Sequence, residues 1–171
     1  MTTHITEAML SAVGRETGWL KSFPVSESDI RRWAVAVYWP DEPPRLFWDS
    51  EFALETRYSG IVAPEEFNPF AWLVADKKVP SPPDDPNDPD RTERLLGIEG
   101  PGLKFMLNGG IEVVYGVRIR PGDVIESTGR VAGYYERAGR LGLMLFTINE
   151  DTWTNQYGDL VKRTRSTLIR Y

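Results

Sequence analysis

GLMLFTIN, residues Gly142 to Asn149, is the stretch that decides the fold. The run is almost continuously apolar, which is typical of a strand buried within a sheet. Ala138-Gly139 comes just before it and predicts a tight turn. We therefore expect this run to be the central strand of a sheet.

Strand-like segments lie on both sides of the central run. Val124 to Glu136 (VIESTGRVAGYYE) precedes it, and Leu160 to Tyr171 (LVKRTRSTLIRY) follows the turn residues Tyr157-Gly158-Asp159. Gly110 to Arg118 (GIEVVYGVR) is the first long strand of this half. Short turns between successive strands predict that chain neighbours pair with each other. The second half of the chain therefore predicts a β-meander.

Arg120-Pro121-Gly122-Asp123 separates the first two strands of this meander. Proline at the second position and glycine at the third are the preference of a type II turn. We expect a tight turn at this point.

The first half of the chain predicts one strand followed by a helix. Gly18 to Val25 (GWLKSFPV) alternates apolar and polar residues, as a half-buried strand does. Ser26 offers a helix N-cap with Asp29 as its partner, and the apolar residues at 30, 33, 34 and 37 share one helical face. The prolines at 40, 43 and 44 end this helix, which lies in the N-terminal part of the chain.

Two more helical segments are expected before residue 75. Phe47 to Tyr58 predicts a short helix or turn with Asp49 or Ser50 as its cap. Pro64 suits the first position of a second helix that continues to Val74, with acidic residues in its first turn. Pro69 lies inside that span, so this helix is either offset or short.

Four strands in sequence plus an early one, with helices confined to the first half, predict an α+β fold with an antiparallel sheet of about five strands. The chain has 171 residues, which suits one domain over residues 1–171. Lys78 to Thr92 holds five prolines and four aspartates, so we expect a solvated loop. Its aspartates do not have the spacing of a calcium loop, and we predict no metal site.

Composition excludes several classes of function. The chain is 41% hydrophobic, has a formal net charge of -5 and contains no cysteine. Its acidic balance disfavours nucleic acid and anionic membranes as partners. The lack of cysteine excludes disulfides and cysteine nucleophiles. Met1 to Val13 lacks the basic start and long apolar run of a secretory signal, so the sequence predicts a soluble, cytoplasmic protein.

Few residues carry obvious chemistry. The sequence has no phosphate-binding glycine loop, no nucleophile elbow and no paired histidines, and it implies no cofactor. The one histidine, His4, lies near the N-terminus, where we expect no role for it. Asp41 and Glu42 are either turn residues or carboxylates beside a substrate channel. Glu112 faces either solvent or a pocket on an apolar strand.

Asn108-Gly109-Gly110 opens the first long strand of the second half. Two adjacent glycines there indicate either a β-bulge or the close approach of a ligand or helix to the backbone. The many tyrosines and tryptophans, including Tyr38 and Tyr58, line either an acyl pocket or a core or subunit interface.

The chain resembles the N-terminal-type MaoC-like dehydratases of the hot-dog superfamily. The resemblance rests on blocks in family order: Val13-Gly14-Arg15-Glu16, the helix over 26–37, Trp48 to Ala53 (WDSEFA), Gly60 to Pro64 (GIVAP), Leu107 to Gly110 (LNGG), Arg120 to Asp123 (RPGD), Thr154 to Asp159 (TNQYGD) and Arg165-Ser166-Thr167. It implies a sheet of about five strands wrapped around a central helix that starts at Pro64, with an extra helix near the N-terminus.

The resemblance also implies reversible hydration of a 2-enoyl thioester carried on coenzyme A or acyl carrier protein. The catalytic stretch of the family has the pattern D-x-N-P-x-H, in which the aspartate and histidine activate water. The corresponding stretch here is Pro40 to Asp49 (PDEPPRLFWD). Asp41 matches the aspartate, the asparagine is missing, and the histidine position falls near Leu46 or Phe47. A phenylalanine cannot transfer a proton.

Three hypotheses follow from this departure. The first is a subunit that shapes the acyl pocket of a hydro-lyase while a second MaoC-like chain supplies the Asp/His pair. The second is a stand-alone lyase or isomerase that uses Asp41, Tyr38, Tyr58 or Asn108. A homodimer is the alternative to a hetero-oligomer. The third is an acyl-thioester binding protein without activity. The residues expected to contact substrate are Tyr38, Tyr58, Asn108, Gly109 and Gly110, and Asp41 is the candidate catalytic residue if the chain takes part in catalysis.

Overall fold

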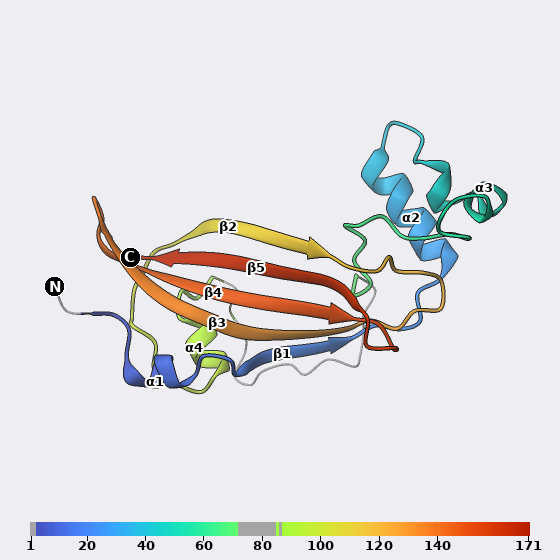
Figure 1. Ribbon diagram of the computed structural model, residues 1–171. Helices are drawn as coiled ribbons and strands as arrows, with labels where there is room; N and C mark the ends of the chain where they lie inside the picture. The colour runs from blue at the N-terminus through green and yellow to red at the C-terminus, as the bar shows by residue number, and fades with distance from the viewer. Residues whose placement is uncertain (1–2, 72–84, 86) are drawn as a thin grey trace.

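A computed structural model describes residues 3–71, 85 and 87–171 (Figure 1). Five strands form one antiparallel sheet in the order β1-β3-β4-β5-β2. Their bounds are β1 Glu16–Lys21, β2 Met106–Tyr115, β3 Glu126–Gly139, β4 Gly142–Thr154 and β5 Leu160–Arg170. The α+β class and the five-stranded antiparallel sheet predicted from the sequence are both confirmed.

The apolar run Gly142 to Asn149 lies in β4, which pairs with β3 on one side and β5 on the other. The prediction of a central strand is therefore confirmed. Strands β3 to β5 form the expected meander. The prediction that β2 belongs to this meander is wrong, because β2 pairs with β5 at the far edge of the sheet.

Residues 116–125 carry the chain from β2 across the end of the sheet to β3. The expected tight turn forms within this connection. Gly122 has a φ of 89°, and the N–H of Asp123 donates to the carbonyl of Arg120 at 3.1 Å. Only glycine adopts this backbone conformation without strain.

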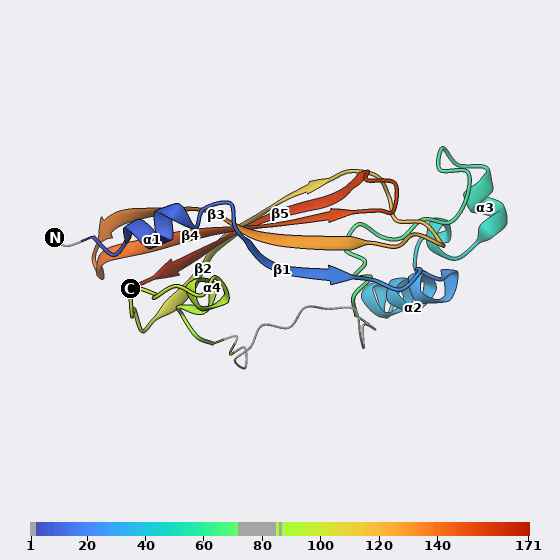
Figure 2. The ribbon, with the colours of Figure 1, turned by 90° about the horizontal axis from the view of Figure 1, so that it is seen from below.

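Short helices lie at both ends of the sheet. α1 Glu7–Ser11 and α4 Arg91–Leu95 lie near the chain termini, whereas α2 Glu27–Tyr38, the 3-10 turn η1 Arg45–Phe47 and α3 Ser50–Leu54 lie at the opposite end (Figures 1 and 2). None of the helices in the described part of the chain has the length and apolar character needed to span a bilayer.

The start of α2 follows the sequence prediction. The Ser26 hydroxyl accepts a hydrogen bond from the N–H of Asp29, and the Asp29 carboxylate accepts one from the N–H of Ser26. This reciprocal capping box satisfies two donors that a helix terminus leaves free. Ile30 and Ala34 then bury the apolar face of α2. Asp49 caps α3 in a similar way, as expected.

The helix expected to begin at Pro64 does not form within residues 64–71, which make turns instead. The Asn68 side chain accepts a hydrogen bond from the N–H of Phe70 at 2.9 Å, which stabilises a turn at the Asn68-Pro69 step. Pro69 would also remove a helical donor. The rest of the expected helix, over 72–74, lies outside the described residues, as does most of the predicted loop over 78–92. At the end of that loop, Arg91 and Thr92 already belong to α4.

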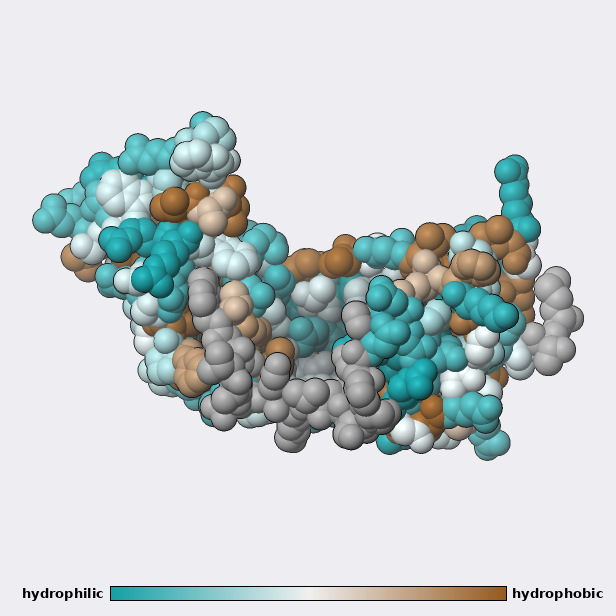
Figure 3. All heavy atoms as spheres, turned by 180° about the vertical axis from the view of Figure 1, so that it is seen from behind, coloured by the Kyte–Doolittle hydropathy of each residue, from teal (hydrophilic) through white to brown (hydrophobic). Residues whose placement is uncertain are grey.

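The buried apolar residues form two separate clusters. The larger one lies at the end with α2 and joins Ile30, Phe47, Phe67, Ile125 and Val161, among others. The smaller one joins Ala12, Leu96 and Val131 near the termini. In Figure 3 the upper outline of the molecule is hollowed between its two ends.

Candidate functional site

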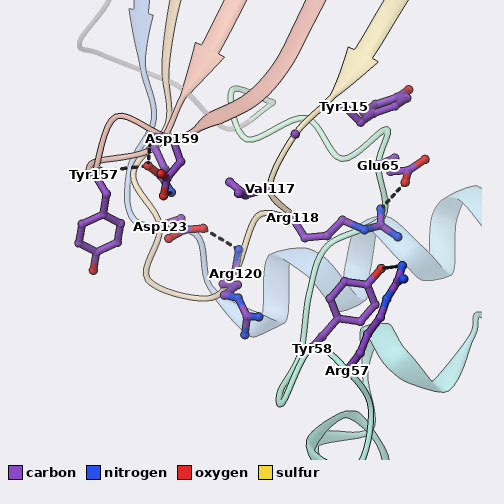
Figure 4. A pocket seen from close by; sticks show the side chains of 12 residues that line it. Arg57, Tyr58, Glu65, Tyr115, Val117, Arg118, Arg120, Asp123, Tyr157 and Asp159 are labelled. Atoms are coloured by element: carbon purple, nitrogen blue, oxygen red, sulfur yellow. Dashed lines mark hydrogen bonds and ion pairs between the residues drawn. The ribbon is translucent and has the colours of Figure 1, made fainter.

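An open cleft of about 590 Å³ lies at the end of the sheet that carries α2 and α3 (Figure 4). Three segments distant in sequence form it: the loop after α3, the connection from β2 to β3, and the hairpin between β4 and β5. The side chains on which its chemistry depends are those of Arg57, Tyr58, Glu65, Arg118, Arg120 and Asp123. We call it the arginine cleft.

Guanidinium groups surround Tyr58 in the arginine cleft. Arg57 donates from Nη2 to the Tyr58 hydroxyl at 2.6 Å, and its guanidinium lies 4.8 Å from the centre of the Tyr58 ring. The guanidinium of Arg118 lies 5.8 Å from the same ring. Hydrogen bonding to Arg57, together with hydrogen bonding and charge from Arg118, lowers the pKa of Tyr58 below its usual value. A lowered phenol pKa indicates a positive local potential.

The arginine cleft also contains three acidic residues, which equal its three arginines in number and are held by other groups: Glu65, Asp123 and Asp159, whose carboxylate accepts from Asn155 Nδ2 at 3.2 Å. Glu65 pairs with Arg118 at 3.4 Å. Asp123 is buried, and its carboxylate accepts hydrogen bonds from the N–H of Arg120 at 2.8 Å and from Gln156 Nε2 at 3.2 Å. Asp123 therefore stabilises the tight turn that precedes β3.

Asp41, the candidate catalytic residue, lies in an exposed loop after α2 and does not line the arginine cleft. Its N–H donates to the carbonyl of Tyr38 at 2.8 Å, which closes the turn after the helix. The Tyr38 ring packs against Phe47 with 6.1 Å between the ring centres. Among the predicted substrate-contacting residues, Tyr58 alone lies in the cleft.

The stretch Pro43 to Asp49 is fixed by local contacts. Trp48 Nε1 donates to the carbonyl of Pro43 at 2.9 Å, and Arg45 pairs with Asp49 at 2.6 Å. The N–H of Phe52 and the Arg45 side chain lower the pKa of Asp49. Phe47, at the position where the family resemblance implies histidine, is buried in the larger apolar cluster. This position therefore stabilises the core here.

Asn108, Gly109 and Gly110 lie on β2, near the end of the sheet opposite the arginine cleft (Figure 1). Asn108 pairs with Leu168 and Gly110 with Thr167, so Gly109 is the extra residue of a β-bulge. A Cβ atom at Gly109 would lie 2.8 Å from Thr167 Cγ2. Of the two interpretations of the paired glycines, the bulge is the one observed, and the structure does not bring these residues together with Tyr58.

His4 is held at the same distant end of the sheet. Its ring Nε2 lies 3.1 Å from the carbonyl oxygen of Leu143, and its backbone N–H donates to the Glu136 carboxylate. Glu112 is exposed on β2 opposite Arg165. Within the described residues, no group of histidine, aspartate or glutamate side chains is arranged to hold a metal ion.

Sequence reasoning missed Arg57, Arg118 and Arg120. Arg57 follows α3, whereas Arg118 and Arg120 lie in the connection from β2 to β3, and only the fold brings these two segments together. The recognisable RPGD block was the available signal, because it places Arg120 in a tight turn.

The family model described as "FAS1-like, dehydratase domain region" matches residues 11–164. No curated protein matches the chain.

Solved structures with a similar fold include the ChsH1-ChsH2 complex from Mycobacterium tuberculosis, with a TM-score of 0.65 and 18% identity over 96% of this chain and 89% of that one. The MaoC-like dehydratase from Rhodospirillum rubrum has a TM-score of 0.56 and 18% identity over 94% and 92%. The HadBC (3R-hydroxyacyl-ACP dehydratase) complex from Mycobacterium tuberculosis has a TM-score of 0.54 and 20% identity over 89% and 95%. These similarities confirm the hot-dog fold.

Proposed function

Because this chain belongs to the family of FAS1-like dehydratase regions, we propose that it is one subunit of an enoyl-thioester hydratase, which in reverse is a 3-hydroxyacyl-thioester dehydratase. In this proposal the chain shapes the acyl pocket, and a second MaoC-like chain supplies the aspartate and histidine that activate water.

The observation that carries the proposal is the bare edge strand β2. All of its residues after Met106 are exposed, and several are large and apolar: Leu107 is 50% exposed, Ile111 59% and Val114 56%. Among the described residues, β5 is the one strand that pairs with β2. Figure 3 shows apolar side chains along the upper rim of the molecule, where Figure 1 places β2.

A long, apolar strand with one unpaired edge is an aggregation hazard unless something covers that edge. A strand from another sheet can add to such an edge through main-chain hydrogen bonds, while the exposed side chains give specificity. Two of the similar solved structures are described as complexes of two chains, ChsH1-ChsH2 and HadBC. A second hot-dog chain on β2 accounts for the exposed edge.

The chain's own residues do not supply the histidine that the family chemistry uses. Phe47 is buried where the resemblance implies that histidine, and His4 lies at the other end of the sheet. Asp41 is exposed in the loop after α2 and is free to face a partner. Asp41 therefore enters the proposal as a group that acts beside the partner's catalytic pair.

The proposed substrate contacts divide into two groups. Tyr38 and Tyr58 lie at the end with α2 and would contact the thioester and its carrier. Asn108, Gly109 and Gly110 lie on β2 and would contact the partner or the acyl chain at the shared edge. The division follows from the length of the sheet, which separates the two groups within one chain (Figure 1).

Reconstitution tests the proposal. The chain is co-purified with a MaoC-like chain that carries an intact Asp/His pair, preferably one encoded by a neighbouring gene, and hydration of a 2-enoyl-CoA is followed by loss of absorbance. We expect activity in the mixture that neither chain has alone.

The two remaining hypotheses are the outcomes that overturn the proposal. Turnover by the purified chain alone, abolished in Asp41→Ala, would indicate a stand-alone enzyme. Thermal stabilisation by an acyl thioester, without turnover in any mixture, would indicate a binding protein.

A further inference from the structure

The hydroxyl of Tyr58 accepts a hydrogen bond but has no acceptor for its own proton. Arg57 Nη2 donates to it at 2.6 Å, and Arg118 acts on the same hydroxyl as a second donor. A guanidinium group has no acceptor atom, so neither arginine can take the phenolic proton. Within residues 3–71, 85 and 87–171, no carboxylate or carbonyl oxygen accepts from this hydroxyl either. The O–H of Tyr58 is therefore available to a ligand.

Two cations hold the Tyr58 ring in place. The guanidinium of Arg57 lies 4.8 Å from the ring centre, and that of Arg118 lies 5.8 Å from it. Arg118 pairs in turn with Glu65 at 3.4 Å. Figure 4 shows the phenolic oxygen beside the ends of both arginines, in a cleft of about 590 Å³. A donor held in this way needs little reorganisation when an acceptor arrives.

The charges around Tyr58 favour a neutral ligand that becomes negative during a reaction. The cleft as a whole is balanced, since its three arginines face the carboxylates of Glu65, Asp123 and Asp159. At Tyr58 itself, hydrogen bonds from Arg57 and Arg118 lower the pKa of the phenol. A more acidic phenol donates a stronger hydrogen bond to an oxygen with developing negative charge. A carbonyl oxygen that turns into an enolate is such an acceptor.

We propose that the Tyr58 hydroxyl donates a hydrogen bond to the carbonyl oxygen of the acyl thioester while its double bond is hydrated. This inference rests on the proposed function, which supplies a 2-enoyl thioester as the substrate. When the water oxygen bonds to C3, the electron pair of the C2–C3 double bond moves toward the carbonyl and gives an enolate. Protonation at C2 restores the carbonyl. Tyr58 keeps its own proton throughout, and the aspartate and histidine of the second chain transfer the protons of the reaction.

Steady-state kinetics of the reconstituted two-chain enzyme tests this role. Tyr58→Phe keeps the ring and removes only the hydroxyl. We expect kcat to fall on the order of a hundredfold while KM changes little, because the hydrogen bond strengthens in the transition state. Tyr135→Phe is the matched control, since Tyr135 is exposed on β3 near the other end of the sheet and stacks on Phe146. We expect it to leave both constants unchanged.

The pH dependence of kcat separates a hydrogen-bond donor from a structural residue. A phenolate cannot donate, so kcat falls as the pH rises through the pKa of Tyr58. The charged groups that face the phenol are Arg57 and Arg118, with Glu65 behind Arg118 and Arg120 near the same loop at Gly60. Arg57→Gln removes one group that lowers this pKa, so the fall in kcat should move to higher pH. Arg140→Gln, exposed in the hairpin between β3 and β4, should leave it in place.

A bound chromophore gives a readout that needs no turnover. Cinnamoyl-CoA is a 2-enoyl thioester whose conjugated system absorbs at longer wavelength when its carbonyl is polarised. Bound to the chain alone or to the complex, it should show a red shift that Tyr58→Phe abolishes and Tyr135→Phe keeps. If this shift is present but no second chain restores turnover, the proposed function alone fails.

Three results would overturn the inference: an unchanged kcat in Tyr58→Phe, a rise in KM alone, or no Tyr58-dependent shift of the chromophore in either the chain or the complex. An active two-chain enzyme with any of these results keeps the proposed function and excludes Tyr58 as the donor.

Discussion

Strand β1 is half-buried over most of its six residues, whereas β2 at the other edge of the same sheet is exposed over nearly all of its ten. Near β1, Lys21 pairs with Glu126 at 2.7 Å, and Arg15 donates to the carbonyl of Leu96, just after α4. Helix α4 also packs near β1. No comparable cover lies over β2 among the described residues.

This contrast shows how one chain treats its two edges differently. A short edge strand beside a packed helix presents few free main-chain groups to another molecule. A long edge strand with exposed apolar side chains presents many. Under the proposed function, β1 closes the subunit and β2 is the edge at which a partner chain would bind.

The largest expected effect comes from removing the anchor of α4, near the covered edge. Arg170 and Glu93 are both fully buried and form two hydrogen bonds, at 2.8 and 2.9 Å. Glu93→Ala leaves the Arg170 guanidinium buried with only part of its hydrogen-bond acceptors. This loss lowers the free energy of unfolding by about 3–5 kcal/mol. Urea denaturation measures this loss.

Glu99→Ala is the control for that change, because Glu99 is exposed four residues beyond α4. We expect its free energy of unfolding to stay within about 0.5 kcal/mol of that of the unmodified chain. Equal stability of the two variants would show that α4 does not depend on the Arg170 contact.

A smaller effect, confined to association, is expected at the bare edge. The double variant Ile111→Lys with Val113→Lys places two charges on β2. Binding to the partner chain should weaken by on the order of tenfold to a hundredfold, since burial of one such side chain contributes about 1.5–3 kcal/mol. Analytical ultracentrifugation of the mixture measures the change.

The fold of this double variant should be unaffected, because both side chains are already exposed. Leu141→Lys, in the hairpin between β3 and β4, is the matched control. If Leu141→Lys weakened association as much as the β2 variant, the interface would lie elsewhere.

Ser26→Ala removes the cap of α2, and we expect it to lower the free energy of unfolding by about 1 kcal/mol. Strand β1 leads directly into this helix, so the variant tests whether the covered side depends on local capping. Thermal denaturation measures the loss, and Ser59→Ala, at an exposed position outside any helix, is the control. Equal melting temperatures for the two variants would contradict a role for the cap.

The smallest effect is a dependence of stability on pH. Burial raises the pKa of Glu150, but hydrogen bonds from Arg165 and Arg130 outweigh it and leave the pKa below its ordinary value. Glu150 therefore stabilises the fold above pH of about 4.3, and this stabilisation is lost as the pH falls through the lower folded-state pKa. Arg165, which pairs with Glu112 of β2 in the sheet register, would then lose its partner.

Urea midpoints at neutral and acidic pH test this dependence. Glu150→Gln should lose less stability on acidification than the unmodified chain does. Glu55→Gln, at an exposed position after α3, should behave like the unmodified chain. Identical acid sensitivity in both variants would exclude Glu150 as the source.

The parts of the fold that depend on neighbouring residues were predictable from the sequence. The capping box at Ser26, the tight turn at Gly122 and the apolar run in β4 each form as expected. The prediction of a helix from Pro64 rested on apolar spacing. It was wrong because the Asn68 side chain and Pro69 favour a turn there. The position of β2 was wrong because turn residues between two strands do not show that those strands pair.

The candidate site was predictable only in part. Tyr58 was named from its residue type, and it does lie in the arginine cleft. Arg118 and Arg120 were not predicted as site residues, because their proximity to Arg57 arises from the path of the chain across the end of the sheet. The buried pair of Glu93 and Arg170 also has no local pattern, since 77 residues separate its members.

Hydrogen exchange measured by mass spectrometry compares the two edges most directly. The amides of β2 and β1 are followed in the chain alone and in its complex with the MaoC-like partner. We expect protection of residues 106–115 to rise sharply in the complex while protection of residues 16–21 stays unchanged. Protection that rises at β1, or at neither strand, in a complex that forms would contradict the assignment of β2 as the subunit interface.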